Sequence, residues 1–412
     1  MMKPLQRIWS YGLRRITDRL SGLVSFANAT SILNDMLHRE EDTLFAPRTI
    51  ADTLGQDGED KEQNDISYTS RVFEETPWLD KEGKVIPSCE IPTSIISPEY
   101  SEQGRKLIEN IRDEVIASYN SHRISEEQIK DKKLIDLIHC CPSDSVFVMI
   151  DSIIIPFQKE HRDVNGVSGT RRDKKSTSIA NAYILTIEGT YCFTAGTERE
   201  VTQRVLAYLV RNNMLSNREL VFLVDGAKGI KSLVKEYFGF RPYSYFLDWY
   251  HLRKKCYELF SMALYGGKAN KERNAAIRYE FFKRLWAGNV DDALSYLERL
   301  DKTYIKSPSF FEAIKEYIGE SKREHIYSYA LRKELGLINS SNRCEKLNDV
   351  IVGERCKDNS ISWSLEGSLH MAQIKIIFHN QEDVDGKWFL DHEAKYQPVP
   401  LSSEMLKHMY AA

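Results

Sequence analysis

The sequence SVFVMIDSIIIPF at residues 145–157 constrains the fold of this chain more than any other segment. It is a run of β-branched and other apolar residues, which is typical of a strand buried on both faces. One charged residue, Asp151, interrupts the run. A buried carboxylate is costly unless it binds a cation or a hydrogen-bond donor. The segment therefore predicts a buried sheet that carries an acid with a partner.

The segments that follow continue the strand pattern and then introduce helices. We interpret them as two strands hinged at Glu188-Gly189 (178–196), a helix (198–215), a strand ELVFLVDGA (219–227), a helix (228–238) and a fifth strand YSYFLDWYH (243–251). The order β-β-β-α-β-α-β predicts a meander of three strands followed by two helix-linked parallel strands. This is the mixed five-stranded sheet of an RNase H-like α/β core. A doubly wound nucleotide-binding fold would alternate strand and helix from the start.

The chain has 412 residues, too many for one typical core, so two or three domains are expected. We predict a mostly helical N-terminal region with a polar linker (1–140), the first part of the core (141–251), an all-helical insertion (252–338), the end of the core (339–380) and a C-terminal tail (381–412). The insertion should break at Gly266-Gly267, Gly288-Asn289 and Ser307-Pro308.

The N-terminal region is the least regular part of the sequence. Its run GQDGEDKEQND and the prolines at 77, 87, 92 and 98 predict a loop-rich or poorly ordered connector at 46–100. Within it, PRTIADTLGQDGED (47–60) is a candidate for one helix of a helix-turn-helix, although no recognition helix is evident. Helical spacing of apolar residues returns at 99–138. We expect this region to recognise DNA ends only if such a motif is present.

Composition excludes several classes of protein. Hydrophobic residues make up 42% and charged residues 28% of the chain, the balance of an ordinary globular protein. No stretch approaches the roughly 20 apolar residues of a membrane helix, so no membrane association is expected. The 7 cysteines form no CxxC pair, which argues against a disulfide framework or a zinc ribbon and favours a reducing cytoplasm. The net charge of −3 does not by itself indicate a nucleic-acid partner.

Two aspartates are expected on neighbouring strands of the sheet. Asp225 follows VFLV at a strand end, and Asp151 lies within the first strand. Such a pair can converge on one cation, and oxygen ligands suit Mg²⁺ or Mn²⁺. Two ions about 4 Å apart would activate a water or a 3′-hydroxyl and stabilise the leaving oxygen. Alternatively, Asp225-Gly226 is only a turn or a helix cap. The chain has no GxxxxGK[ST] loop, so a P-loop ATPase is excluded.

Three further polar residues each allow two interpretations. Glu345, in NSSNRCEKLNDVIVGERC, is a third candidate carboxylate, but its spacing from Asn342 is also that of a capping box. Asp248 and His251, in FLDWYH, form either a structural hydrogen bond at a strand end or an accessory pair beside an active site.

The blocks VFLVDGAKGI, FLDWYHLRKK and LINSSNRCEKLNDVIVGERCKDNSISWSLEGS together resemble bacterial insertion-sequence transposases with a DDE catalytic domain. The resemblance covers roughly residues 145–375 and depends on the order and spacing of the blocks. It departs from the family at KDNSIS, where a glycine-methionine pair is expected, and in the tail.

The resemblance implies a polynucleotidyl transferase that uses two Mg²⁺ or Mn²⁺ ions to cut double-stranded DNA at element ends and join it to a target. It implies that Asp151, Asp225 and Glu345 are the catalytic metal ligands, with Asp248, His251, Asn342 and Trp363 as accessory residues. Trp363 and Ser364 match a W-S motif that packs near the catalytic helix or touches DNA. A homo-oligomer in the bacterial cytoplasm, associated with the nucleoid, is implied by analogy.

Basic clusters are the expected contacts to the DNA backbone. They are Arg171, Arg172, Lys174 and Lys175 in the first hairpin, and Arg253, Lys254 and Lys255 at the start of the insertion. Each cluster has the alternative interpretation of a solvated surface. Three other functions stay open: a plain RNase H-like nuclease, a decayed or domesticated transposase that only binds DNA, and an unrelated helical interaction protein.

Overall fold

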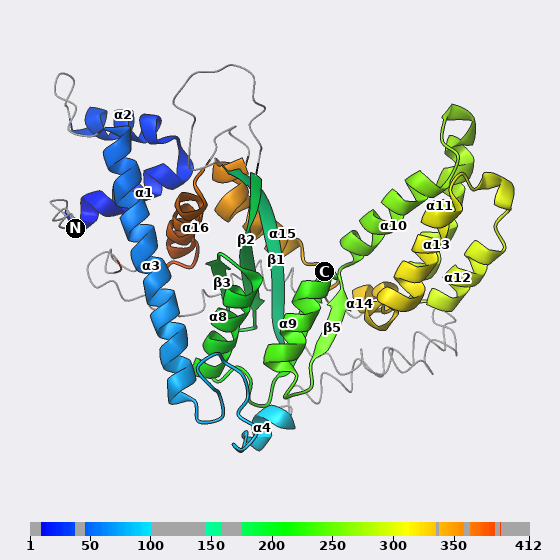
Figure 1. The fold of residues 1–412 in the computed structure, drawn as a ribbon, viewed down its shortest axis with the longest axis horizontal. Coiled ribbons are helices and arrows are strands. Elements are labelled where there is room, and N and C mark those ends of the chain that lie inside the picture. Colours follow the sequence, from blue (N-terminus) through cyan, green and yellow to red (C-terminus); the bar gives the residue numbers. More distant parts are fainter. Residues whose placement is uncertain are drawn as a thin grey trace.

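A five-stranded mixed sheet forms the centre of the molecule (Figure 1). The computed structural model describes residues 10–37, 46–99, 145–157, 175–334, 338–357, 363–383 and 388. The strands are β1 (Ser145–Phe157), β2 (Lys175–Leu185), β3 (Thr190–Ala195), β4 (Glu219–Val224) and β5 (Ser244–Leu247). Their order is β3-β2-β1-β4-β5. The β1–β2 and β2–β3 pairs are antiparallel and the β1–β4 and β4–β5 pairs are parallel. The predicted meander followed by two parallel strands is confirmed.

Both faces of the sheet are buried, as the apolar run of β1 predicts. Along β1, Val146 and Val148 face one hydrophobic core, and Phe147 and Met149 face the other. This alternation follows from the two-residue period of a strand. Helices α8 (Glu198–Arg211) and α9 (Lys228–Phe238) supply the first core. Helices α15 (Asn342–Asn348) and α16 (Leu365–His379) supply the second, together with the π-helix η5 (Asp349–Lys357) that continues α15.

The fifth strand is shorter than predicted. The expectation of a strand over 243–251 is wrong, because β5 ends at Leu247 and α10 begins at Trp249. Asp248 is the N-cap of α10, and its carboxylate accepts a hydrogen bond from the His251 backbone N–H at 3.0 Å. Apolar and aromatic residues lie on both sides of the boundary between β5 and α10. The capping aspartate is the only residue in the sequence that marks this boundary.

The segment after β5 folds into a lobe of helices with its own hydrophobic core, to the right in Figure 1. Its α-helices are α10 (Trp249–Ala263), α11 (Lys271–Trp286), α12 (Val290–Glu298), α13 (Pro308–Glu316) and α14 (Tyr329–Glu334). Shorter turns are η1 (Lys268–Asn270), η2 (Lys302–Tyr304), the π-helical η3 (Tyr317–Ser321) and η4 (Arg323–His325). The three predicted helix breaks are confirmed. Gly288 has φ +82°, and a Cβ there would meet the Ser328 backbone at 2.8 Å.

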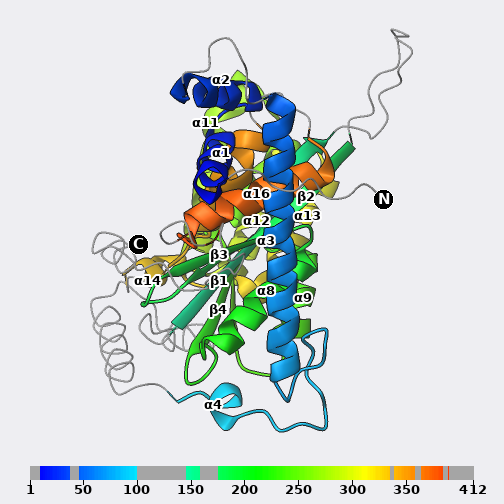
Figure 2. The same cartoon turned by 90° about the vertical axis from the view of Figure 1, so that its left-hand side faces the viewer.

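The N-terminal region contains α1 (Tyr11–Leu23), α2 (Phe26–Met36), α3 (Pro47–Glu75) and the single turn α4 (Thr93–Ile96). The prediction of a loop-rich connector at 46–100 is wrong for 47–75. That stretch is one helix of 29 residues, and Figure 2 shows it running along one side of the molecule. The candidate helix at 47–60 is simply its first half. The helix predicted at 99–138 lies almost wholly outside the described residues.

Helix α3 has a polar sequence because its buried face makes ion pairs. Asp57 pairs with Arg14, and Lys61 pairs with Asp65 and with Glu382, the latter at 3.3 Å. The helix also approaches α16 closely at Gly58, where a Cβ would lie 2.6 Å from the Cα of His370. Charged and glycine residues that normally indicate a loop therefore form an interhelical contact here. Among the described residues, no helix is both long and apolar enough to cross a bilayer.

Candidate active site

The predicted acidic residues lie at one edge of the sheet. Strands β1, β4 and β5 are parallel, so their carboxyl-terminal ends share an edge, where sites form in open α/β sheets. Met149 of β1 pairs with Leu223 of β4, and two residues further along each chain come Asp151 and Asp225. Asp248 follows the end of β5 directly. The topology thus brings three aspartates from adjacent strands together.

Asp151 is held by two hydrogen-bond donors. Its Oδ1 accepts from the Ser152 backbone N–H at 2.8 Å, and its Oδ2 accepts from Asn348 Nδ2 at 2.7 Å. Burial raises the pKa of the Asp151 carboxyl, the Ser152 N–H opposes this, and the negative charges of Asp225 and Glu345 raise it further. These effects place all three carboxylates within electrostatic reach of one another.

Asp225 opens a tight turn at the end of β4. Its Oδ1 accepts from the Ala227 backbone N–H at 2.7 Å, and Gly226 adopts φ +84°. A side chain at 226 would also meet Leu247 at 2.7 Å, so glycine is required on both counts. Lys322, from the helical lobe, donates from Nζ to the Gly226 carbonyl. The turn interpretation of Asp225 is therefore correct, and it leaves the second carboxylate oxygen, Oδ2, without a hydrogen bond to any described residue.

Glu345 projects from α15 toward the same edge. The capping-box interpretation is wrong: Ser341 is the N-cap, Asn342 is the first exposed residue of the helix, and neither side chain caps it. Instead Glu345 Oε1 lies 3.2 Å from Nε2 of His251. Burial raises the pKa of Glu345, His251 lowers it, and Asp248 and Asp349 raise it. The side chain is 34% exposed, so it is open to solvent and to a ligand.

Asp248 and His251 join α10 to α15. Asp248 is fully buried and accepts from the Ser341 backbone N–H and from Ser341 Oγ, the latter at 3.1 Å. Nδ1 of His251 lies 3.3 Å from Asp248 Oδ1, close enough for an ion pair but without good hydrogen-bond geometry. The structural interpretation of this pair, hydrogen bonding at the end of the fifth strand, is confirmed, and the accessory role stays a prediction. Asp248 fixes the start of both helices, and His251 connects it to Glu345.

The surroundings of Asp248 and His251 favour the charged form of each side chain. Burial alone would lower the pKa of His251, but Asp248, Glu345 and Asp225 outweigh it and the pKa is raised. Burial would raise the pKa of Asp248, but hydrogen bonds from His251 and Ser341 outweigh it and the pKa is lowered. His251 thus lies between two carboxylates, whose charges favour its protonated form.

Trp363 is buried rather than facing solvent. Its Nε1 donates to the Arg355 carbonyl at 3.3 Å, and its ring lies 5.7 Å from the ring of Phe26. The Arg355 guanidinium lies 5.0 Å from the Trp363 ring. Ser364 caps α16 by accepting from the Gly367 N–H at 3.0 Å. The W-S motif therefore joins η5, α16 and the N-terminal helices.

The predicted basic clusters are described only in part. Arg171, Arg172 and Lys174 lie outside the described residues, and Lys175 is the first residue of β2. Arg253, Lys254 and Lys255 are exposed on the first turns of α10. The charge of Lys254 lowers the pKa of Glu345, which places this cluster beside the acidic edge.

Four site residues were missed by the sequence analysis. Asn348 and Asn181 form a hydrogen-bonded chain to Asp151, Ser341 anchors Asp248, and Lys322 supports the Asp225 turn. Asn348 could have been found, because it lies three residues after Glu345 on the same helix face. The others become visible only in the tertiary structure.

The chemistry of the donor set suits a hard divalent cation. Asp151, Asp225 and Glu345 offer only carboxylate oxygens, and the charges of Asp225 and Glu345 raise the pKa of Asp151, an effect that a cation would oppose. In the described ranges, however, no three His, Cys, Asp or Glu side chains are arranged to hold one ion. His251 contacts Glu345, and Asn348 contacts Asp151. The three carboxylates are thus suitable ligands for a divalent cation, but in this structure Glu345 contacts His251 instead.

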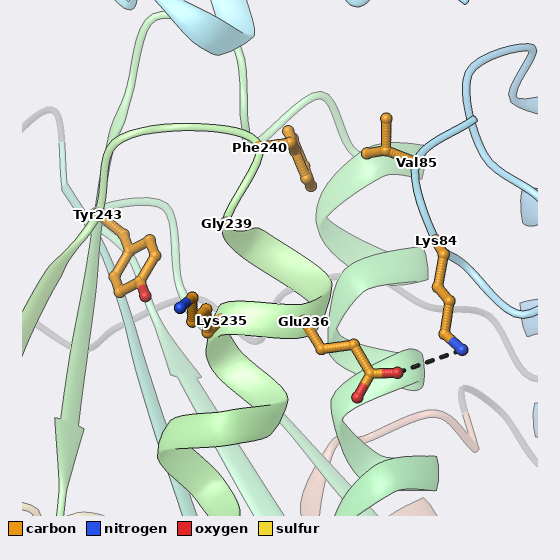
Figure 3. Close-up of a pocket in the computed structure, with 7 residues that line it drawn as sticks. All are labelled: Lys84, Val85, Lys235, Glu236, Gly239, Phe240 and Tyr243. Carbon is orange, nitrogen blue, oxygen red and sulfur yellow. Dashed lines mark ion pairs between the residues drawn. The ribbon is translucent and has the colours of Figure 1, made fainter. Parts of the chain in front are cut away.

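A surface hollow of about 450 Å³ lies away from this edge (Figure 3). It is lined by Lys84, Val85, Lys235, Glu236, Gly239, Phe240 and Tyr243. These residues come from the end of α9, the approach to β5 and the segment after α3. The hollow is therefore at the opposite end of β5 from Asp248 and takes no part in the acidic site.

No known protein family matches this sequence, and no characterised protein matches it either. The function must therefore be argued from the sequence blocks and from the arrangement of the acidic edge.

Proposed function

We propose that this chain is a DDE transposase that cleaves DNA phosphodiesters at the ends of an insertion sequence and transfers the freed strand to a target. The observation that carries the proposal is that Asp151 and Asp225 lie on adjacent parallel strands at one edge of the sheet, with Glu345 near enough for its charge to raise the pKa of Asp151. The observed strand order also supports an RNase H-like core, because it matches the order expected for that fold.

In the proposed reaction, Asp151, Asp225 and Glu345 hold two Mg²⁺ or Mn²⁺ ions, which activate the attacking oxygen and stabilise the leaving oxygen when bound. Water first breaks the bond between phosphorus and the 3′ oxygen at the element end, and the 3′ oxygen takes up a proton. The 3′-hydroxyl then attacks a target phosphodiester, so one P–O bond forms as another breaks. Catalysis is positioning plus charge stabilisation.

The protein groups around the carboxylates have separate tasks in this scheme. Asp248 and Ser341 fix α15, and His251 contacts Glu345, which would serve as a ligand of the cation. Lys322 fixes the Gly226 turn and so the direction of Asp225. Arg253, Lys254 and Lys255 lie where they can bind backbone phosphates of a DNA duplex near the carboxylates. Pairing of two element ends calls for a homo-oligomer, and the site of action is the bacterial nucleoid.

The test uses end-labelled duplex that carries the element's own ends, with Mg²⁺ or Mn²⁺. Asp225→Ala and Glu345→Ala should abolish cleavage. Glu366→Ala, an exposed glutamate in the first turn of α16, is the matched control and should cleave normally. Joined products identify a transposase, and cleavage without joining identifies a nuclease. DNA binding without cleavage in the wild type identifies a protein that only binds DNA. Cleavage that survives both substitutions refutes the site.

A further inference from the structure

The amide of Asn348 faces the Asp151 carboxylate. Asn348 lies three residues after Glu345, so both side chains leave the same face of α15. Its Nδ2 donates to Asp151 Oδ2 at 2.7 Å, and its Oδ1 accepts from Nδ2 of Asn181 at 2.6 Å. Asn181 is fully buried on β2, directly opposite Asp151 in the strand register. Three side chains from α15, β2 and β1 thus form one chain of hydrogen bonds.

The carboxylate of Asp151 determines which groups donate and which accept along this series of hydrogen bonds. An ionised carboxylate only accepts hydrogen bonds, so the NH₂ group of Asn348 must face Asp151. The carbonyl oxygen of Asn348 then faces Asn181, whose NH₂ group must in turn face it. This leaves Asn181 Oδ1 buried without a hydrogen-bond partner among the described residues. The orientation that Asp151 imposes on Asn348 therefore leaves one oxygen of Asn181 unsatisfied.

The chain also fixes the Asp151 carboxylate. With Oδ1 bound by the Ser152 N–H and Oδ2 bound by Asn348, the plane of the carboxylate cannot rotate freely. Each oxygen accepts one hydrogen bond and keeps a second lone pair for a cation. Groups that hydrogen-bond to a metal ligand orient it, and their loss weakens metal binding by about 10–100-fold.

We propose that Asn348, held by Asn181, is a positioning residue that orients Asp151 to share a divalent cation with Asp225. This inference rests on the proposed function, because it assigns a partner to one of its carboxylates. It also means that α15 contributes twice, through Glu345 as a ligand and through Asn348 as the orienting donor.

The test measures Mn²⁺ binding by calorimetry on the full-length protein without DNA, and then the Mn²⁺ concentration that gives half-maximal DNA cleavage. Asn348→Leu keeps the volume but removes the donor, and it should bind Mn²⁺ about 10–100-fold more weakly. Its cleavage should need correspondingly more Mn²⁺, and its maximal rate should change less. Asn380→Ala is the control, since Asn380 is a buried asparagine that bonds to Cys192 and Glu382 instead.

Asn380→Ala should lower the melting temperature and leave Mn²⁺ affinity unchanged. If Asn348→Leu does not fold, Asn181→Ala tests the same chain, because Asn348 then loses its fixed orientation; a several-fold weaker affinity is expected. Wild-type affinity in a folded Asn348 or Asn181 variant refutes this inference alone. A wild-type protein that neither binds Mn²⁺ nor cleaves DNA refutes the proposed function and this inference with it.

Discussion

Replacing Asp248 separates two contributions of one buried carboxylate. Asp248 caps α10 through the His251 backbone N–H, and it binds Ser341 at the start of α15. Asp248→Ala removes both interactions. Asp248→Asn retains the cap, because asparagine caps helices as well as aspartate does, but it removes the charge. The two variants therefore report on the cap and on the charge in turn.

The expected losses follow from these contacts. A lost N-cap costs about 1 kcal/mol. Hydrogen bonds to a charged group contribute about 1.5–3 kcal/mol, so losing those from Ser341 adds a second, larger cost. Asp248→Ala should lower the free energy of unfolding by about 3–4 kcal/mol. Asp248→Asn should lower it by about 1.5–3 kcal/mol, because Oδ1 still caps the helix while the amide NH₂ that replaces Oδ2 faces the Ser341 backbone N–H and cannot accept from it.

Urea unfolding followed by circular dichroism measures both values. Asp301→Ala is the control, because Asp301 also caps a short helix, at 2.9 Å from the Thr303 N–H, but is exposed to solvent. It should cost clearly less than Asp248→Ala, because only an exposed cap is lost. A loss for Asp248→Ala below about 1 kcal/mol would refute the reasoning, since the cap alone should cost that much. Equal losses in Asp248→Ala and Asp248→Asn would show that the cap contributes nothing.

Three further substitutions, at Lys61, Gly58 and His251, test how buried charges and close contacts affect stability, each against a contrasting variant or condition. Lys61→Met leaves Glu382 buried without its cation, although Asp65 keeps Arg204, and should cost about 3–5 kcal/mol in urea unfolding, whereas Lys84→Met removes surface pairs and should cost nothing measurable. Gly58→Ala should cost about 1–3 kcal/mol because its Cβ meets His370, whereas Gly55→Ala has open space and should gain about 0.5–1 kcal/mol in melting experiments. The pKa of His251 is raised above its ordinary 6.5, so its stabilising effect is full below pH 6.5 and is lost as pH rises through the folded-state value. The stability difference between wild type and His251→Gln should therefore shrink on going from pH 6 to pH 9, and a constant difference would contradict this.

The sheet could be predicted because its signals are local. The apolar run of β1 and the hinge at Glu188-Gly189 define strands without knowledge of the rest of the chain. The breaks at Gly267 and Gly288 are local too, since both glycines adopt positive φ. A parallel pair of strands then brings Asp151 and Asp225 to one edge by topology alone.

Helix α3 and the Asn348 contacts could not be predicted, because their partners are distant in sequence. The charges of α3 indicate a loop until Arg204 and Glu382 are known to be their partners. Asn181 and Asn348 are 167 residues apart. The strand prediction failed at Asp248 for a different reason, because the same apolar residues suit β5 and α10 equally well.

The buried contacts of α3 also determine when this helix can complete its packing during synthesis of the chain. Glu62 of α3 contacts Gln373, 311 residues further along the chain. At about 5–20 residues per second, α3 leaves the ribosome roughly 15–60 s before Gln373 is made. During that interval Lys61 has Asp65 beside it but not Glu382. Helix α3, the longest helix of the described residues, therefore lacks one of its buried ion-pair partners until the last part of the core has been synthesised.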